Sequence, residues 1–453
     1  MLVSLSSLDI GNDVGYVYDT DVNETDNDFK ANFRLPRREV ILQPGRRLVI
    51  VPLPRAKEAD ADWYGTAAEA LPDDAGSSIL VGRIWDPAVR GPSPVVVRDG
   101  DVFDISAHFP TVRDICELLE PAGVVAELRG PRIGSFEDVL ANTGAAVRDP
   151  DFPWLLAPVD LQALKAAGVT FPVSMIERVI EERARGDLSL AADIRDRMLA
   201  DVGADLHDLL PGSEEAARLK ALLIAEGFWS QYLEVAIGPD AEIFTKGQIL
   251  SAVGTADAVG VLASSDWNNS EPEVALVVQS SGRIIGGTLG NDMNLRDVEG
   301  RSALLLPMAK DNNASCALGP LVRLFDEQFD LESVRQLEVR LDIQGVDGFH
   351  LEAVSEMTRI SRDPEGLVRQ LIGPHHHYPD GAVLMLGTMF APVQDRDHPG
   401  EGFTHKVGDV VRIGSSPLGG LVNRVRHAED CAPWDFGIRD LMGNLVERGL
   451  LGM

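Results

Sequence analysis

The stretch 270-SEPEVALVVQSSGRIIGGTLGNDMNLRDVEG-300 decides the fold, because it predicts two long strands joined by a tight turn at SSGR. Residues two apart in a strand face the same side, so Glu271 and Glu273 project together from the head of the first strand. The second strand ends near Asp292, where a hairpin partner returns to the same end of the sheet. Three carboxylates are therefore expected to converge there.

Buried carboxylates at this spacing repel one another, and one of them is driven to bind a proton unless a cation neutralises the group. Mg²⁺ prefers oxygen ligands and commonly takes a few carboxylates from the protein, whereas Mn²⁺ and Ca²⁺ are alternatives by ligand type. In the other interpretation, Glu271 and Glu273 lie on the solvent face of an edge strand and Asp292 caps a turn. The spacing alone does not decide between the two.

Composition narrows the classes of partner. The chain has 453 residues, of which 45% are hydrophobic, so it can bury a large core and exceeds the usual size of one domain. Its formal net charge of −30 repels phosphate backbones and anionic lipid. We expect neither nucleic acid nor a membrane surface as a partner.

The N-terminal residues and the cysteines bear on location. The start, MLVSLSSLDIGNDVG, lacks a basic segment followed by an apolar run, and no window reaches the ~18 apolar residues of a spanning helix. Cys116, Cys316 and Cys431 lie far apart, which suggests neither a disulfide framework nor a zinc site. We expect a cytoplasmic protein.

The chain divides into four segments of different character. Residues 1–76 are an extension of uncertain order that ends in a linker-like run, and 77–150 predict a small N-terminal αβ domain with a hairpin at Asp99-Gly100. Residues 151–235 carry charged helical periodicity and predict a helical connector. Residues 236–453 are rich in short β-branched runs and predict a sheet domain, so the class is α+β.

An ordered series of motifs resembles the fumarylacetoacetate hydrolase superfamily. The series runs NNSEPEVALVV, GGTLGNDMNLRDVEGRS, AKDNNASCALGP, LMLGTMFAP and GFTHKVGDVVRIG. It covers roughly residues 78–451 and is more specific than any single motif. The resemblance implies a catalytic mixed-β roll with a divalent metal, Mg²⁺ in the first instance, held by Glu271, Glu273 and Asp292.

Within the superfamily, the sequence is more similar to the branch that dehydrates 2-keto-3-deoxy sugar acids than to the carbon–carbon hydrolases. The features are LKAAGVTF before a charged helix, RSALLLPMAKDNNASCALGP around the lysine, and PWDFGIRDLMGNLVERGLL near the C-terminus. The hydrolases place a histidine, often with a glutamate, on a loop over the metal, and we find no counterpart. The resemblance also implies a homodimer or homotetramer.

The same resemblance makes Lys310 the active-site lysine and gives Gly387-Thr388 the task of holding the substrate carboxylate through an N–H and a hydroxyl. A lysine in a confined site beside a metal has a lowered pKa, so Lys310 is a candidate base or proton shuttle. Alternatively, it pairs with Asp292 or Asp311 and positions substrate charge. A Schiff base with the keto group is a third, less favoured interpretation.

Other polar residues are candidates for acid–base work and substrate binding. The helix around 172–185 carries Glu181 and Glu182, either of which could be a second acid/base group, although charges on a solvated helix face are the more ordinary interpretation. Ser302 and Ser315 flank the lysine segment and can bind substrate hydroxyls. Arg296 either binds the carboxylate or, as we favour, braces Asp292.

The expected chemistry is dehydration of a 2-keto-3-deoxy sugar acid such as 2-keto-3-deoxy-pentonate. A metal that polarises the 2-keto group makes the C3 protons acidic, the resulting enolate is stabilised, and the C4 hydroxyl leaves with an acid. The product would be 2,5-dioxopentanoate. The rivals are an acylpyruvate or diketo-acid hydrolase on the same metal site and a catalytically silent relative.

Overall fold

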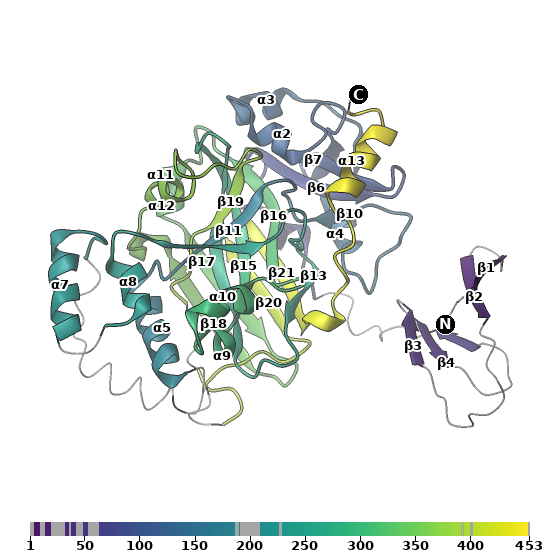
Figure 1. Cartoon of the computed structure of the whole chain (residues 1–453). Helices are drawn as coiled ribbons and strands as arrows, with labels where there is room; N and C mark the ends of the chain where they lie inside the picture. The colour runs from purple at the N-terminus through teal and green to yellow at the C-terminus, as the bar shows by residue number, and fades with distance from the viewer. Residues whose placement is uncertain are drawn as a thin grey trace, which may run out of the picture. The chain divides into compact units, whose positions relative to one another are not determined.

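The computed structural model describes residues 63–185, 190, 209–225, 229–390, 392, 394–398 and 402–451, and the backbone of five strands nearer the N-terminus (Figure 1). The chain forms two compact units, Met1–Asp60 and Ala61–Met453. In the first unit, β1 (Ser4–Asp9) pairs with β2 (Val14–Asp19), and a separate three-stranded sheet follows. That sheet contains β3 (Asn32–Leu35), β4 (Arg38–Ile41) and β5 (Val49–Pro52).

The second unit contains an 11-stranded and a 5-stranded sheet. The strands of the larger sheet are β6 (Leu80–Asp86), β7 (Gly91–Arg98), β8 (Asp101–Asp104), β9 (Arg132–Ser135), β10 (Trp154–Leu156), β11 (Ala163–Gly168), β12 (Glu242–Gly247), β14 (Asn268–Val278), β15 (Ile284–Leu295), β16 (Cys316–Leu324) and β19 (Ala382–Met385). The smaller sheet contains β13 (Asp257–Val261), β17 (Glu338–Gln344), β18 (His350–Glu356), β20 (Val410–Ser415) and β21 (Gly419–His427).

The helices are mostly short. They are α1 (Ala67–Ala70), α2 (Val112–Cys116), α3 (Pro121–Glu127), α4 (Phe136–Ala141), α5 (Pro172–Ala184), α7 (Glu214–Ala225), α8 (Gln231–Ile237), α9 (Arg296–Glu299), α10 (Leu306–Lys310), α11 (Leu331–Arg335), α12 (Pro364–Leu371) and α13 (Ile438–Glu447), with single 3₁₀ turns between some of them. This mixture of helices with large mixed sheets confirms the α+β class. Among the residues described, no helix is long and apolar enough to cross a membrane.

The β14–β15 hairpin forms the centre of the larger sheet. Its strand order is β12-β11-β19-β14-β15-β16-β6-β7-β8-β9, with β10 also on β6. Strand β14 pairs antiparallel with β15 along its length and with β19 over residues 275–278, and every residue of β14 is buried. The predicted turn lies at 279–283, where Gly282 takes a φ of +86°. Because both side chains are buried, the interpretation that places Glu271 and Glu273 on the solvent face of an edge strand is wrong.

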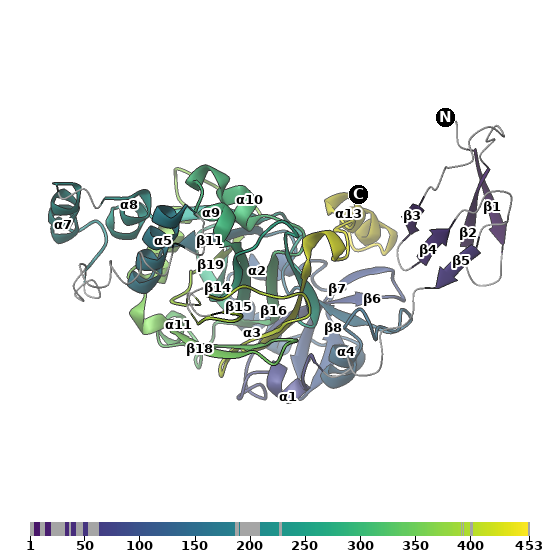
Figure 2. The same ribbon diagram turned by 90° about the horizontal axis from the view of Figure 1, so that it is seen from below.

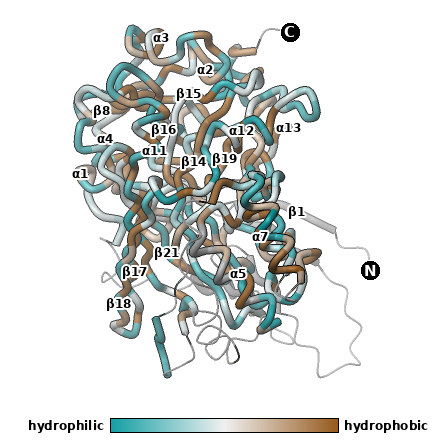
Figure 3. Tube along the Cα trace, turned by 90° about the vertical axis from the view of Figure 1, so that its left-hand side faces the viewer, coloured by the Kyte–Doolittle hydropathy of each residue, from teal (hydrophilic) through white to brown (hydrophobic). Residues whose placement is uncertain are grey.

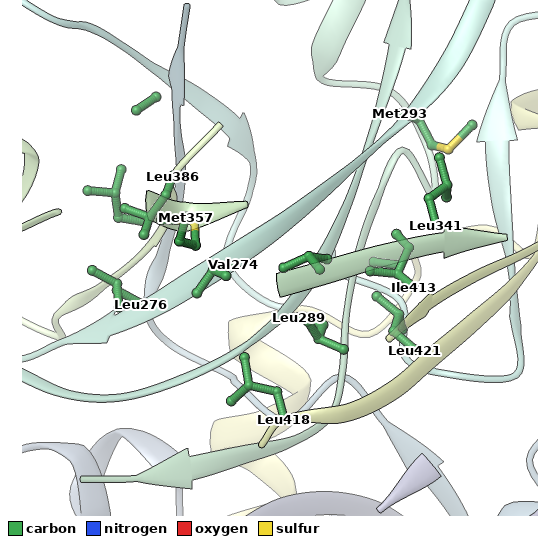
Figure 4. Packing of buried hydrophobic residues seen from close by; sticks show 14 of the residues in the cluster. Val274, Leu276, Leu289, Met293, Leu341, Met357, Leu386, Ile413, Leu418 and Leu421 are labelled. Atoms are coloured by element: carbon green, nitrogen blue, oxygen red, sulfur yellow. The ribbon is translucent and has the colours of Figure 1, made fainter. Parts of the chain in front are cut away.

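Alternating residues of β14 serve two different hydrophobic cores. Val274, Leu276 and Val278 face the core shared with the 5-stranded sheet, whereas Ala275 and Val277 face the other side of the sheet. Figure 4 shows Val274 and Leu276 with Leu289 of β15 among the packed side chains of the first core. In Figure 3, hydrophobic colour follows the strands. Burial on both faces explains the near-continuous apolar run of VALVV.

The segment 77–150 contributes strands to the larger sheet. Its hairpin turns at Asp99 and Gly100, with φ of +51° and +79°, as the Asp-Gly signal predicts. The segment also contains the short helices α2 and α4, where the side chains of Thr111 and Ser135 accept N-cap hydrogen bonds. Because β6 pairs with β16, these strands and the central hairpin share one sheet.

The linker-like run at the end of residues 1–76 packs on the second compact unit. That unit is Ala61–Met453, and Asp74 accepts two hydrogen bonds of 2.7 Å from the buried Arg323. The segment 151–235 begins with strands β10 and β11 before its helices, and β11 lies between β12 and β19. Figure 2 shows α5, α7 and α8 projecting together to one side of the sheets.

Leu276 provides a test of the core. It is fully buried in the centre of β14, so Leu276→Ala should lower the free energy of unfolding by about 2–5 kcal/mol through lost transfer energy and a residual cavity. Urea unfolding followed by circular dichroism measures the change. Leu304→Ala is the control, since Leu304 is 90% exposed and the change should stay within about 0.5 kcal/mol. Equal effects would contradict the assigned core.

Candidate active site

The central hairpin brings the three carboxylates together. Glu271 lies directly opposite Asp292 in the β14–β15 register, and Glu273 lies two residues further along the same face. One oxygen from each lies within 4.8 Å of the others, and all three residues are buried. The convergence expected from the sequence is therefore present in the structure.

The carboxylates differ in electrostatic environment. Burial would raise the pKa of Glu271, but the Lys310 ammonium and the Arg178 guanidinium lower it to about 2. Burial also raises the pKa of Glu273, and the negative charges of Asp292 and Glu271 raise it further, well above its usual range. Gly387 N–H donates to Glu273 Oε2 at 2.6 Å, and no cationic side chain among the described residues pairs with it.

Lys310 lies at the end of α10 and contacts two of the three carboxylates. Its Nζ donates to Glu271 Oε2 and lies 3.2 Å from Asp292 Oδ2. Burial lowers the pKa of Lys310, but these carboxylates outweigh it and the pKa lies above the usual lysine range. The structure thus shows the pairing with Asp292 that we considered as the alternative to a base.

Lys246 of β12 is a buried cation that the sequence analysis missed. It is fully buried, and its Nζ lies 2.8 Å from Asp292 Oδ1. The same ammonium donates to the carbonyl oxygens of Met293, at 3.0 Å, and of Lys310. Lys246 therefore holds both the Asp292 carboxylate and the backbone at Lys310 in place. Its own side chain is not part of the cavity lining.

Glu242, also on β12, is a further acidic residue that the sequence analysis missed. It lines the same cavity as Lys310 and the three carboxylates. Burial raises its pKa, and the cations of Arg178 and Lys310 only partly oppose this. In the register, Gly168 of β11 lies opposite Glu242, and a Cβ on Gly168 would come 2.1 Å from Glu242 Oε2. The absence of a side chain at Gly168 therefore leaves space for the Glu242 carboxyl group.

Helix α5 supplies a half-buried arginine to the cavity. Arg178 Nη2 lies 2.6 Å from Glu271 Oε1, and its Nη1 donates to Glu299 of α9. Glu182, one turn further along the helix, accepts from the Gln231 side chain at 3.0 Å and does not line the cavity. The side chain of Glu181 lies outside the described residues. The helix thus reaches the site through Arg178.

Gly387 and Thr388 line the cavity beside Glu273. Gly387 requires its glycine: φ is +86°, and a Cβ would lie 2.1 Å from Thr170 Oγ1 and 2.8 Å from the Ala167 carbonyl oxygen. The Thr388 hydroxyl accepts from Phe390 N–H at 3.1 Å. The N–H that the resemblance assigns to a substrate carboxylate here donates to Glu273.

Three predicted substrate-binding residues occupy different surroundings. Arg296 lines the cavity, stacks over Trp267 at 4.3 Å and donates to the Pro392 carbonyl at 3.0 Å. Ser302 accepts from Leu304 N–H, capping the short 3₁₀ turn, and Ser315 donates to the Lys310 carbonyl at 2.8 Å. Neither serine lines the cavity. The ion pairs to Asp292 come from Lys246 and Lys310.

The cavity has the charge of a cation site. It encloses about 490 Å³ of empty space including its mouth, with Phe244 and Phe390 among its apolar walls. Its lining has five carboxyl groups and three cationic side chains, and Lys246, outside the lining, pairs with one of the five. The carboxyl groups still outnumber the cations, and three converging carboxylates are suitable ligands for a hard ion. The raised pKa of Glu273 shows that the surroundings disfavour a negative charge on this carboxyl group, and a cation bound beside it would remove that penalty.

Two curated relatives are similar to the chain in sequence, while no protein-family model matches it. A 2-dehydro-3-deoxy-D-arabinonate dehydratase of Saccharolobus solfataricus is 31% identical over 185 residues, which are 41% of this chain. The chain spans only 58% of the length of that relative. A probable 2-keto-3-deoxyxylonate dehydratase of Haloferax volcanii is 28% identical over 271 residues, 58% of this chain and 88% of the relative.

Solved structures share the fold. The apo form of a 2-keto-3-deoxy-D-arabinonate dehydratase has a TM-score of 0.54 at 22% identity, over 77% of this chain and 99% of that one. A second structure, of that dehydratase complexed with magnesium and 2,5-dioxopentanoate, has the same TM-score at 21% identity and the same coverage. These comparisons confirm the resemblance to dehydratases of 2-keto-3-deoxy sugar acids, the branch that the sequence motifs indicated.

The carboxylate trio predicts a pH-dependent metal site. Because a cation must displace the proton that the raised pKa holds on Glu273, metal affinity should rise with pH and fall as the carboxyl is protonated. Mn²⁺ titration followed by electron paramagnetic resonance at about pH 6 and about pH 8 measures this.

Glu273→Gln should weaken Mn²⁺ binding more than about a hundredfold, beyond the loss typical of residues that only orient a ligand. Glu182→Gln is the matched control, with unchanged affinity, because Glu182 does not line the cavity. Tight Mn²⁺ binding by the Glu273→Gln protein would contradict the metal site.

Lys246 should be essential to stability. Lys246→Met leaves Asp292 Oδ1 without its ion pair in a buried site, and we expect a loss of about 3–5 kcal/mol in unfolding free energy. Urea denaturation measures it. Lys165→Met on the neighbouring strand is the control, because that half-buried lysine donates to Thr245 and its loss should cost about 1 kcal/mol or less. A loss no greater than that of the control would remove Lys246 from its assigned role.

Proposed function

We propose that the protein is a Mg²⁺-dependent hydro-lyase that dehydrates a 2-keto-3-deoxy sugar acid, such as 2-keto-3-deoxy-pentonate, to 2,5-dioxopentanoate. The observation that carries the proposal is the buried cluster of Glu271, Glu273 and Asp292, in a cavity that also holds Lys310 and Glu242. Both curated relatives are named dehydratases of this substrate class, and a fold relative was solved with magnesium and 2,5-dioxopentanoate.

Glu271, Glu273 and Asp292 would hold Mg²⁺, with Mn²⁺ or Ca²⁺ as alternatives. When bound, the cation would act as a Lewis acid on the 2-keto acid and make the C3 protons acidic. Gly387 and Thr388, beside Glu273, would orient the substrate carboxylate through a backbone N–H and the Thr388 hydroxyl, which for Gly387 requires giving up its hydrogen bond to Glu273. Arg296 would add a positive charge to the same cavity.

Lys310 and Glu242 are the two groups placed for proton transfer. Lys310 would take a proton from C3. To do so it must first lose its own proton, which requires that the negative charges of Asp292 and Glu271 be neutralised. Glu242, with a raised pKa and no tight ion pair among the described contacts, would protonate the departing C4 hydroxyl. Loss of a C5 proton and tautomerisation would then give the aldehyde. Glu242 takes the role for which we considered Glu181 and Glu182.

The lining of the cavity supports dehydration over the rival hydrolase. Acylpyruvate hydrolysis needs a water-activating histidine, often with a glutamate, over the metal. The described cavity lining contains no histidine. His405 lies in the GFTHKVGDVVRIG motif. It is buried outside the cavity lining, where it contacts Asp409 at 3.2 Å and the Ser270 hydroxyl at 3.1 Å.

The proposal extends to the domain organisation, the location and the oligomeric state. Residues 236–453, together with the earlier strands that pair with them, would form a catalytic mixed-β roll, which carries an N-terminal αβ region and a helical connector. The protein would work on a small 2-keto acid in the cytoplasm as a homodimer or homotetramer. The unit of residues 1–60 would be an appendage to this catalytic body.

Turnover of 2-keto-3-deoxy-pentonates and acylpyruvates, with Mg²⁺ and with chelator, tests the function. We expect metal-dependent loss of water and formation of 2,5-dioxopentanoate, detected by mass spectrometry. Pyruvate and a carboxylic acid from an acylpyruvate would indicate the hydrolase instead. Tight Mg²⁺ binding without turnover of any keto acid would indicate the catalytically silent relative.

Variants of the two proton-transfer groups separate chemistry from metal binding. Lys310→Met and Glu242→Gln should each lower kcat by at least about a hundredfold, since one positioned acid or base contributes about 10²–10⁴-fold. Both should retain Mn²⁺ affinity within about tenfold, because neither is a metal ligand. An unchanged kcat in either variant would return that residue to a structural role.

A further inference from the structure

Asn269 is a buried polar residue in the cavity wall whose acceptor is unused. It is 2% exposed and lines the same cavity as the carboxylates. Its Oδ1 is buried and has no hydrogen-bond partner among the described residues. A buried amide oxygen left without a donor costs about 1–3 kcal/mol, so such atoms in a cavity wall point to a ligand that supplies the donor.

The orientation of the Asn269 amide follows from its neighbour. Its Nδ2 donates to the Ser270 carbonyl oxygen at 3.0 Å. If the amide were turned over, two acceptor oxygens would face each other at that distance, which is repulsive. The free group is therefore the oxygen, and the missing partner is a donor such as a hydroxyl.

Asn269 extends the row of acidic residues along β14. Asn269, Glu271 and Glu273 lie two residues apart on one face, each step spanning about 7 Å of strand. Gly387 and Thr388 lie at the Glu273 end of the row. A substrate whose carboxylate is held at that end directs its other end toward Asn269.

We propose that Asn269 is a specificity residue whose Oδ1 accepts a hydrogen bond from the substrate hydroxyl that is retained, the one on C5 of a 2-keto-3-deoxy-pentonate. This rests on the proposed function. A neutral amide cannot protonate a leaving group, so it suits a hydroxyl that stays on the substrate rather than the C4 hydroxyl that departs. Asn269 thus selects sugar acids over keto acids with an apolar tail.

The test compares 2-keto-3-deoxy-pentonate with its 5-deoxy analogue, 4-hydroxy-2-oxopentanoate, which can still lose water. The Mg²⁺-loaded wild-type protein should show a kcat/KM about tenfold or more lower for the analogue, because the analogue leaves Oδ1 unpaired. Asn269→Ala should lose about tenfold on the hydroxylated substrate and less than about threefold on the analogue.

Asn291→Ala is the matched control. Asn291 of β15 is also fully buried with an unpartnered Oδ1, but it faces the opposite side of the sheet, toward Asn423. Its variant should keep the wild-type ratio between the two substrates. Equal losses on both substrates in Asn269→Ala, or no loss on either, would overturn the proposal.

Two further measurements distinguish substrate selection by Asn269 from metal ligation and from a failure of the proposed function. Mn²⁺ affinity should be unchanged in Asn269→Ala; a large loss would make Asn269 a metal ligand and overturn the specificity role.

If the wild-type protein dehydrates neither compound, the proposed function fails, and calorimetric binding of both compounds to the Mg²⁺-loaded protein decides the inference. Wild-type protein should bind the hydroxylated compound at least about fivefold tighter. Equal affinities would refute it, even if Asn269→Ala does not fold.

Discussion

The register of one hairpin sets the rest of the site. Glu271 lies opposite Asp292 only because β14 and β15 pair as they do, and a shift of one residue would turn both carboxylates toward the hydrophobic core. The alternation along β14 holds the register, since Val274, Leu276 and Val278 must face the 5-stranded sheet. Hydrophobic burial on one face therefore specifies the positions of charged groups on the other.

Buried charge at this hairpin is compensated by residues from distant segments. Lys246 comes from β12, Lys310 from the end of α10 and Arg178 from helix α5. Each makes a specific ion pair with Glu271 or Asp292, whereas Glu273 receives a backbone N–H. This unequal compensation leaves one carboxylate ready for a further cation. The carboxyl groups of the cavity lining outnumber its cationic side chains, which are Arg178, Arg296 and Lys310.

The hairpin and its carboxylates could be predicted because the signals are local. Period-two spacing, a Gly-containing turn and an apolar run are all contained in residues 270–300. Glu242 and Lys246 escaped prediction because their relation to the site depends on the pairing of β12 with β11 and on contacts with β15. The alternation of Glu242 and Phe244 with Lys246 on one strand was the available signal. Helical periodicity likewise does not predict which charged residue of α5 reaches the site. In the structure Arg178 contacts Glu271 in the cavity, whereas Glu182 contacts Gln231.

The place of β19 in the sheet has a consequence for synthesis on the ribosome. This strand lies between β11 and β14, yet it is about a hundred residues later in the chain than β14. Until it emerges, the strand that bears Glu271 and Glu273 presents an unpaired edge. The nascent chain thus exposes the apolar edge of residues 275–278 for an extended period, and the adjacent acidic head of β14 places like charges nearby that disfavour pairing between two such chains.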